Sequence, residues 1–574
     1  MTSAYESDPI FETVPRQLSN LVTRIRGREI ALPDFQRNFV WDSTKTEELI
    51  QSIISKFPVG TLLFWKQGAD EQFASRNFEG APELGEKIPN ELVLDGQQRL
   101  TALYQALTGT GDERFYLKVD EFIDLQNGEV REFHEVDFEK AIISLPASGG
   151  RAQTKKNNDT LGISHFPVAD VVTFDDWLDD YVEVLTSQNS SHSAKALKSL
   201  YRKMRDKFIV PLRSYGLPVL TLPETTPIEA VCTIFETLNR TGKPLGPFEL
   251  LTARYYPQGV NLRDYWLEAQ ADYQSLGDFK VDPYNVLQAV CLRAYGSAQR
   301  SDVLKKLTAN DIREHWNSVI QGVAGVIDML QSDCGVVSPK WLPYGMILVP
   351  MAATWSEIQD LQPLDRGPAY ERLQKFFWCS VFTTNYDQGA NSQVGADFSR
   401  LRGWVISGEG KAPEAVEELP LSSSTFRSAS VRRKALYAGF MCLLIKSRAE
   451  DFHTGQAMTR HRVQEVQIDS HHIFPKAYLA REENAESAEL ILNRSLVDAE
   501  TNRIIKDKAP SKYLADMAEA FGEDKLRSVL ASHAITLEPD SGIARDSYAA
   551  FLDERLKTIA QLIESVTGRR LQAD

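Results

Sequence analysis

The chain has 574 residues, of which 43% are hydrophobic and 25% are charged, a composition typical of a globular protein. This length exceeds what one hydrophobic core supports, so more than one domain is expected. The formal net charge of −15 argues against a protein that coats nucleic acid indiscriminately, although local charge can still favour DNA.

Targeting and cysteine patterns indicate a cytoplasmic protein with no membrane partner. The longest apolar runs fall well short of the roughly 20 residues that a membrane span requires. The first ten residues are polar and acidic, unlike a secretory signal. The five cysteines are widely spaced and form no CxxC pair, which predicts buried thiols in a reducing compartment.

The first hundred residues alternate helix and strand patterns. Thr44 and Glu47 have the spacing of a capping box, and the apolar residues behind them recur at helical spacing up to Phe57. Strands are predicted over Thr61–Trp65, Glu91–Leu94, Arg114–Val119 and Leu217–Leu222.

The second predicted strand runs directly into Asp95-Gly96-Gln97-Gln98-Arg99, and a helical pattern follows. A strand, a turn and a helix in this order can receive a phosphate, because the free N–H groups of the first helical turn favour an anion. Asp95 could hold a cation or a water, and Arg99 could bind two phosphate oxygens. The alternative is that this segment only shapes a turn and a core helix. The sequence lacks a Walker A loop, which excludes a P-loop NTPase.

Helical periodicity dominates from about residue 261 to 406, and the Gly-, Glu-, Pro- and Ser-rich stretch Gly408–Ser424 is the predicted linker. Basic residues then gather ahead of a histidine pair; they are Arg427, Arg432, Arg433, Lys434, Lys446, Arg448, Arg460 and Arg462. This run is either a solvated surface or a surface that contacts DNA phosphates.

The histidine pair follows a predicted strand, Val463–Ile468, in the segment Asp469-Ser470-His471-His472-Ile473-Phe474-Pro475. Next comes a loop that contains Asn493, followed by a predicted short strand at Ser495–Asp498. A helix is predicted over Ala499–Leu514, with Asn502 in its first turn. A neutral histidine can activate water near pH 7. A Mg²⁺-type ion prefers oxygen ligands and keeps several waters, so few protein ligands suffice. The alternative is a chance His-His pair followed by ordinary capping asparagines.

This segment resembles the HNH, or His-Me finger, nucleases in the variant found at the C-terminus of GmrSD-type restriction proteins. The resemblance implies that His472 is the general base, that Asn493 pins the loop that orients the base, and that His471 and Asn502 are metal ligands. Asp469 matches a supporting acidic position of the metal site. Many relatives have Asp where His471 stands, a departure that bears on metal preference.

Three N-terminal segments resemble the N-terminal domain of the same GmrSD-type proteins, a fold similar to ParB and sulfiredoxin that binds and hydrolyses nucleotides. They are Leu32–Trp41, Asp95–Arg99 and Phe235–Leu245. The resemblance implies a nucleotide site, with Asp95 also catalytic, formed by Gln36, Arg37, Asp95, Gly96, Gln97, Gln98, Arg99 and Asn239, with Gly242 as a further candidate.

The expected fold class is α+β multidomain: a ParB/sulfiredoxin-like nucleotide-binding domain (1–260), a helical middle (261–410) and a ββα-metal (HNH) nuclease domain (411–574). The expected function is an NTP-regulated DNA endonuclease that uses Mg²⁺ or Mn²⁺ and acts in type IV restriction or anti-phage defence. Its partners would be phage or modified DNA and a nucleoside triphosphate of unspecified base. A homodimer is possible, because one HNH site normally cuts one strand and a double-strand break would need two cuts or two sites. The alternatives are a nucleotide-switched DNA sensor that acts by binding, and an RNA-directed toxin.

Overall fold

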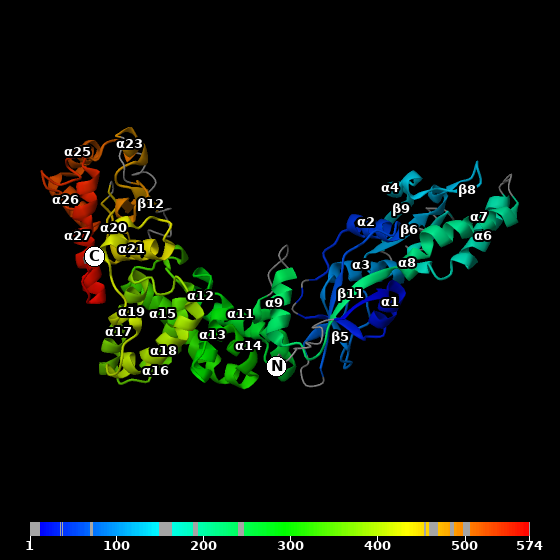
Figure 1. Ribbon diagram of the computed structural model, residues 1–574, viewed down its shortest axis with the longest axis horizontal. Coiled ribbons are helices and arrows are strands. Elements are labelled where there is room, and N and C mark those ends of the chain that lie inside the picture. Colours follow the sequence, from blue (N-terminus) through cyan, green and yellow to red (C-terminus); the bar gives the residue numbers. More distant parts are fainter. Residues whose placement is uncertain are drawn as a thin grey trace, which may run out of the picture. The chain divides into compact units, whose positions relative to one another are not determined.

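The computed structural model describes residues 12–34, 36, 38–68, 73–147, 164–187, 193–238, 246–452, 455–458, 469–482, 487–497 and 505–572. The chain divides into two compact units, Met1–Asn261 and Leu262–Asp574. Strands are concentrated in the first unit and helices dominate the second (Figure 1), so the fold is of the expected mixed α and β kind. None of the helices in the described parts is long and apolar enough to cross a membrane.

A six-stranded mixed sheet organises the first unit, with strand order β1-β11-β3-β5-β2-β4. β11 pairs with β3 in parallel, and β5 pairs antiparallel with β3 and parallel with β2. The strands are β1 (Glu12–Gln17), β2 (Ile30–Pro33), β3 (Leu62–Lys66), β4 (Ser75–Arg76), β5 (Glu91–Asp95) and β11 (Gly216–Leu222). The strands predicted at Thr61–Trp65, Glu91–Leu94 and Leu217–Leu222 are thus confirmed as β3, β5 and β11.

The first unit also contains smaller sheets and several helices. A second sheet has the order β10-β6-β9, and its strand β6 (Glu113–Lys118) is the strand predicted at Arg114–Val119. The remaining strands are β7 (Ile123–Asp124), β8 (Glu129–Val130), β9 (Ile142–Pro146) and β10 (His165–Pro167). The helices are α1 (Leu18–Arg26), α2 (Ser43–Ile54), α3 (Gln97–Thr108), α4 (Phe138–Ala141), α6 (Phe174–Ser187), α7 (Ala194–Met204), α8 (Pro211–Ser214), α9 (Ile228–Leu238) and α10 (Pro247–Tyr255).

Helix α2 begins earlier than its sequence pattern predicts. Asp42 is the N-cap, and its carboxylate accepts a hydrogen bond of 2.9 Å from the Lys45 N–H. The capping box predicted at Thr44 is therefore wrong, because Asp42 is the extended residue that precedes the first helical turn. Of the apolar positions predicted behind it, Leu49, Ile50, Ile53 and Ile54 are buried, whereas Phe57 lies beyond the end of the helix and is exposed.

The second unit is mainly helical. Its helices are α11 (Leu262–Asp272), α12 (Gln274–Asp278), α13 (Pro283–Tyr295), α14 (Arg300–Lys306), α15 (Ala309–Asp333), α16 (Leu348–Gln359), α17 (Pro363–Phe382), α18 (Ala390–Ser407), α19 (Glu414–Glu417), α20 (Ser423–Ser428), α21 (Lys434–Lys446), α23 (Lys476–Arg481), α25 (Pro510–Phe521), α26 (Glu523–Ser532) and α27 (Tyr548–Thr567). One small sheet, β12 (Asp469–His472) with β13 (Arg494–Val497), lies among them. Helix α17 contacts both α21 and α27, so the predicted helical middle and the predicted nuclease segment share one compact unit.

The segment predicted to be a linker, Gly408–Ser424, is packed. It contains α19, and the side chains of Ala412, Ala415 and Val416 are buried. Arg569 donates to the Ala415 carbonyl at 2.9 Å, which ties the segment to the end of α27. The prediction was wrong because small and apolar residues lie among the polar ones, and their side chains pack against the rest of the unit. The cysteines are buried as predicted, and all five thiols are free.

Candidate functional site

The predicted nuclease histidines lie in a short antiparallel ladder. β12 pairs with β13 in a register that sets His471 opposite Ser495 and His472 opposite Arg494. Directly opposed residues of such a ladder project from the same face, with Cβ atoms roughly 5 Å apart. The ladder therefore brings His472 next to a guanidinium that is far from it in the sequence. The strand predicted at Val463–Ile468 lies outside the described residues.

Asn493 is fully buried and closes the turn that follows the histidines. Its amide nitrogen donates to the carbonyls of Phe474 and Ala488, each at 3.0 Å. Its amide oxygen accepts from the Phe474 N–H at 2.8 Å, and its backbone carbonyl accepts from the Ile473 N–H at 2.9 Å. These bonds hold the two residues after His472, so Asn493 restricts the backbone that carries the imidazole.

The imidazole of His472 is partly buried, with 20% of its side chain exposed. Its Nε2 lies 3.4 Å from Glu489 Oε1, but the approach lacks hydrogen-bond geometry. Among the described residues Nε2 thus has no hydrogen-bond partner. Burial, reinforced by the nearby Arg494 charge, lowers the pKa of His472 to about 4. The ring is therefore neutral near pH 7 and can accept a proton.

Two residues that the sequence analysis did not select, Glu489 and Arg494, complete the surroundings of His472. Arg494 donates to the Glu489 carboxylate and, at 3.2 Å, to the Ser470 carbonyl. Lys476 Nζ lies 3.6 Å from Glu489 Oε1. The Arg494 guanidinium holds the pKa of Glu489 below its usual range despite the opposing effect of burial. Arg494 could have been found as the residue beside Asn493, whereas Glu489 has no local signal.

The turn after β12 is held from further elements. Tyr513 of α25 donates to the Ile473 carbonyl at 3.0 Å, and Tyr437 of α21 bonds to the Ser470 hydroxyl. Arg555 of α27 is buried and donates to the carbonyls of Leu492 and Arg494, at 2.6 and 2.8 Å, on either side of Asn493. The turn is thus fixed from several helices as well as from within.

The proposed metal ligands are only partly described. His471 lies on β12, whereas Asn502 and the side chain of Asp469 lie outside what the structure describes. Within the described parts, no three His, Cys, Asp or Glu side chains converge as a metal site would require. The helix predicted over Ala499–Leu514 is interrupted, because Lys506 has a φ of 50° and α25 begins only at Pro510.

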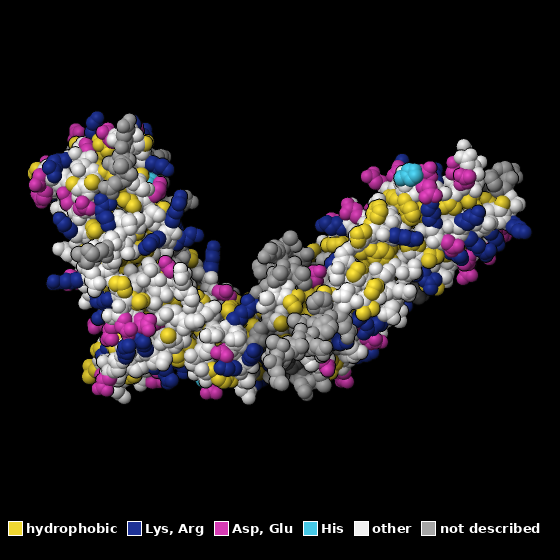
Figure 2. Space-filling model, in the orientation of Figure 1, with side chains coloured by type: hydrophobic (Ala, Val, Ile, Leu, Met, Phe, Trp, Pro, Cys, Tyr) yellow, Lys and Arg dark blue, Asp and Glu magenta, His cyan; other side chains and the backbone are white. Residues whose placement is uncertain are grey.

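Part of the basic run adjoins this site. The Val431 N–H donates to the Glu489 carbonyl at 3.1 Å, and Arg432, Arg433 and Lys434 follow at once and are exposed. Arg427 and Lys446 are engaged elsewhere, with Asp553 and the Asp333 carbonyl respectively, and Arg460 and Arg462 lie outside the described residues. Figure 2 shows basic and acidic side chains interspersed on the face in view, so that face carries no continuous basic patch.

In the first unit, β5 ends at Asp95 and α3 begins at Gln97, as the sequence predicts. Gly96 has a φ of 87°, and a Cβ there would lie 2.3 Å from Leu62 Cδ2. Arg99 donates to the carbonyls of Val59 and Thr61, at 2.6 and 2.9 Å, and lies 3.3 Å from Asp95 Oδ2. Arg99 thus fixes a neighbouring loop, while the Asp95 side chain is 38% exposed.

Glutamine side chains fasten the 36–40 segment to this turn. Gln36 donates to the carbonyls of Val93 and Leu94, both at 2.8 Å, and its buried Oε1 has no hydrogen-bond partner in the described parts. Gln98 accepts from the Val40 N–H at 2.9 Å and donates to the Asn38 carbonyl at 3.1 Å. The structure therefore brings Gln36 and Asp95–Arg99 together. Arg37, Asn239 and Gly242 lie outside the described residues.

Comparison with known proteins shows what this chain is similar to. The chain is 28% identical to the uncharacterized protein MJ0686 of Methanocaldococcus jannaschii over 612 aligned positions, which cover 96% of this chain and 98% of that protein. Residues 18–256, which lie within the first unit and include the Asp95–Arg99 turn, match the profile described as GmrSD restriction endonuclease, N-terminal domain. The first unit is therefore similar to the N-terminal domain of a GmrSD restriction endonuclease.

Proposed function

We propose that the chain is a metal-dependent DNA endonuclease with an HNH-type site in its second unit, regulated by a nucleoside triphosphate bound to its first unit. The observation that carries the proposal is the clamp of Asn493 on Phe474, which fixes the backbone beside a neutral, partly exposed His472. An asparagine that pins this loop is what the HNH resemblance implies.

His472 would act as the general base. Its lowered pKa keeps the imidazole unprotonated near pH 7, and part of the ring is exposed, although Nε2 itself is buried beside Glu489. It can therefore take the proton of a water that attacks the phosphodiester phosphorus, while the bond to the leaving oxygen breaks. Glu489, 3.4 Å from Nε2, would stabilise the imidazolium that results.

The other residues of the site would bind, orient and balance charge. Asn493, Tyr513 and Arg555 hold the turn, and Arg494 and Lys476 place positive charge near the position of a phosphate. His471 and Asn502 would hold a Mg²⁺ or Mn²⁺ ion, with Asp469 in support, and the ion would stabilise negative charge on the phosphate and the leaving oxygen. An imidazole and an amide oxygen suit such an ion when water and phosphate supply the remaining ligands.

The first unit would bind and hydrolyse the nucleotide at the turn between β5 and α3. The match to the GmrSD N-terminal domain supports this assignment, as does the gathering of Gln36 and Asp95–Arg99. In a protein of this kind, nucleotide binding would gate cleavage of modified or foreign DNA, which is type IV restriction or anti-phage defence. The partly exposed Asp95 is the residue best placed to meet a ligand.

Cleavage assays test the proposal. Purified protein is incubated with unmodified plasmid, modified phage DNA and RNA, with Mg²⁺ or Mn²⁺ and with each nucleoside triphosphate. We expect metal-dependent DNA cleavage that the His472→Ala variant lacks. Binding without cleavage would instead favour a DNA sensor, and cleavage of RNA alone would favour an RNA-directed toxin.

A further inference from the structure

A cavity of about 340 Å³ lies between α11 and α15 in the second unit. Buried side chains of Ala269, Trp316 and Ile320 contribute its apolar surface. Aromatic and polar side chains line the rest; they are Tyr265, Glu268, Asp272, Tyr273, Asn317 and Gln321. The volume is at the lower end of the roughly 300–1,000 Å³ of small-molecule pockets.

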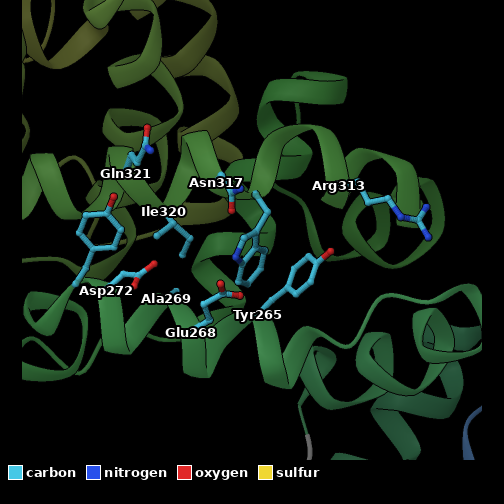
Figure 3. A pocket seen from close by; sticks show the side chains of 10 residues that line it. Tyr265, Glu268, Ala269, Asp272, Arg313, Asn317, Ile320 and Gln321 are labelled. Atoms are coloured by element: carbon cyan, nitrogen blue, oxygen red, sulfur yellow. The ribbon is translucent and has the colours of Figure 1, made fainter.

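The two carboxylate side chains of this cavity, Glu268 and Asp272, are exposed. Glu268 and Asp272 form no ion pair or hydrogen bond with any residue that the structure describes. Arg313 also lines the cavity, but it donates to Asn310 at 2.7 Å, and its guanidinium points away from the two carboxylates (Figure 3). Among the described residues, therefore, neither carboxylate of the cavity is paired with a cation, although Arg313 adds one positive charge to the lining.

These features select the chemistry of a ligand. Two adjacent carboxylates repel phosphate and favour a cation. The rings of Tyr265 and Trp316, with centroids 5.8 Å apart, add aromatic surface that attracts ammonium groups and covers methylene groups. Glu268 and Asp272 are separated by four residues on α11, which places them about 6 Å apart along the helix axis. That separation is close to the distance between the two ammonium groups of an extended four-carbon diamine.

We propose that this cavity binds an aliphatic diamine or polyamine. Each carboxylate accepts charge-assisted hydrogen bonds from one ammonium group, and the chain between them lies against the aromatic and apolar surface. Asn317 and Gln321, which α15 presents one turn apart, accept further N–H groups through their amide oxygens. The site is separate from the proposed nuclease and nucleotide residues, and its occupancy is independent of DNA cleavage.

Isothermal calorimetry on the full chain tests the proposal with 1,4-diaminobutane and spermidine as ligands. Butylamine and 1,4-butanediol are the matched probes with one ammonium group and with none. The Glu268→Gln and Asp272→Asn variants each remove one charge from the cavity without changing side-chain shape. The control is Asp278→Asn, which removes one charge from the end of α12, outside the cavity.

We expect saturable diamine binding that weakens by about tenfold or more in each cavity variant and is unchanged in Asp278→Asn. Butylamine should bind more weakly, and butanediol should not bind. Equal diamine affinities in wild type, Glu268→Gln and Asp278→Asn would overturn the proposal. Binding would then reflect only the general attraction of a cation to an acidic protein. Binding of deoxynucleosides in place of diamines would overturn it too, because the cavity would then recognise a base.

Discussion

Two side chains of opposite charge set the chemistry of His472. Burial and Arg494 lower its pKa to about 4, whereas Glu489 opposes that shift. Because the folded pKa lies below the ordinary value, the imidazole stays neutral as the pH falls from 7 towards 5. As the proposed general base, His472 should therefore lose activity only at lower pH than an exposed histidine would.

The first prediction concerns this base. Changing His472→Ala should lower the cleavage rate by a factor on the order of 10² or more, since general-base catalysis contributes about 10²–10⁴. Folding and NTP hydrolysis should be retained, because the side chain belongs to the second unit. Single-turnover cleavage of a labelled duplex measures the effect, with the exposed histidine variant His134→Ala as the control. A His472→Ala protein that cuts at the wild-type rate would remove His472 from the mechanism.

The second prediction separates metal ligands from the residue that positions the base. His471→Ala and Asn502→Ala should raise the Mg²⁺ concentration required for half-maximal cleavage. Asn493→Ala should instead lower the rate at saturating Mg²⁺, because it releases the backbone at Phe474. Metal titrations of the three variants make the comparison. Identical titration curves for all three and the wild type would show that these roles are misassigned.

At the scale of elements, the ladder of β12 and β13 is held by a buried network. Ser495 lies opposite His471, and its hydroxyl is 2.6 Å from His533 Nδ1 at the end of α26. Arg555 of α27 donates to the His533 carbonyl at 3.0 Å and also to the Arg494 carbonyl. The geometry of the small sheet therefore depends on helices that follow it by many residues.

This network predicts a pH dependence of stability. Burial lowers the pKa of His533 to about 4, below its ordinary 6.5. The stabilisation is fully present above pH 6.5 and is lost as the pH falls from 6.5 towards 4, with a loss of at most about 3 kcal/mol. Urea unfolding of wild type and His533→Gln at pH 7.5 and 5 measures the difference. The variant should be less stable at pH 7.5 yet lose less stability on acidification. Equal losses in both proteins would contradict the prediction.

The segment before α21 gives a prediction on DNA affinity. Arg432, Arg433 and Lys434 are exposed and directly follow Val431, whose N–H donates to the Glu489 carbonyl. Changing Arg432→Gln or Arg433→Gln should weaken binding to all duplex sequences and reduce the slope of log affinity against log salt by about 1 per lost phosphate contact. Fluorescence anisotropy over a salt series provides the measurement. Lys411→Gln, whose ammonium is paired with Glu418, is the control. An unchanged slope would show that these residues do not contact DNA phosphates.

For the whole molecule, the open question is whether the two units communicate. A nucleotide can alter cleavage only if it binds two arrangements of the protein with different affinity. Arg99 is a poor probe of this, because its removal would also release the loop at Val59 and Thr61. Asp95 is the cleaner probe, since its side chain is partly exposed and makes one contact with Arg99.

The fifth prediction tests this coupling. Asp95→Asn should abolish NTP hydrolysis and any effect of NTP on DNA cleavage, while cleavage without nucleotide is retained. We expect NTP to activate the wild type on the correct DNA, because an ungated intracellular nuclease would attack its host. Cleavage and hydrolysis are measured over an NTP series in wild type, Asp95→Asn and the control Asp124→Asn. Superimposable cleavage curves for the wild type and Asp95→Asn would show that nucleotide binding in the first unit does not affect cleavage in the second.

The sequence by itself determined the local features of this protein. Short apolar runs located β3 and β5, further strand patterns located β6 and β11, and helical spacing of apolar residues located the buried face of α2. The resemblance of the segment from His472 to Asn493 to HNH nucleases likewise implied a loop that Asn493 holds. Such features depend on residues that are neighbours in the sequence, so they can be recognised in a single sequence.

Only the tertiary structure decided which distant groups meet. It placed Glu489 and Arg494 around His472, committed Arg99 to two backbone carbonyls, and packed the segment expected to be a linker. It also formed the acidic cavity from α11 and α15, whose lining residues carry no common motif. These outcomes follow from strand register and helix packing, which depend on contacts between elements far apart in the chain and leave no local pattern in it.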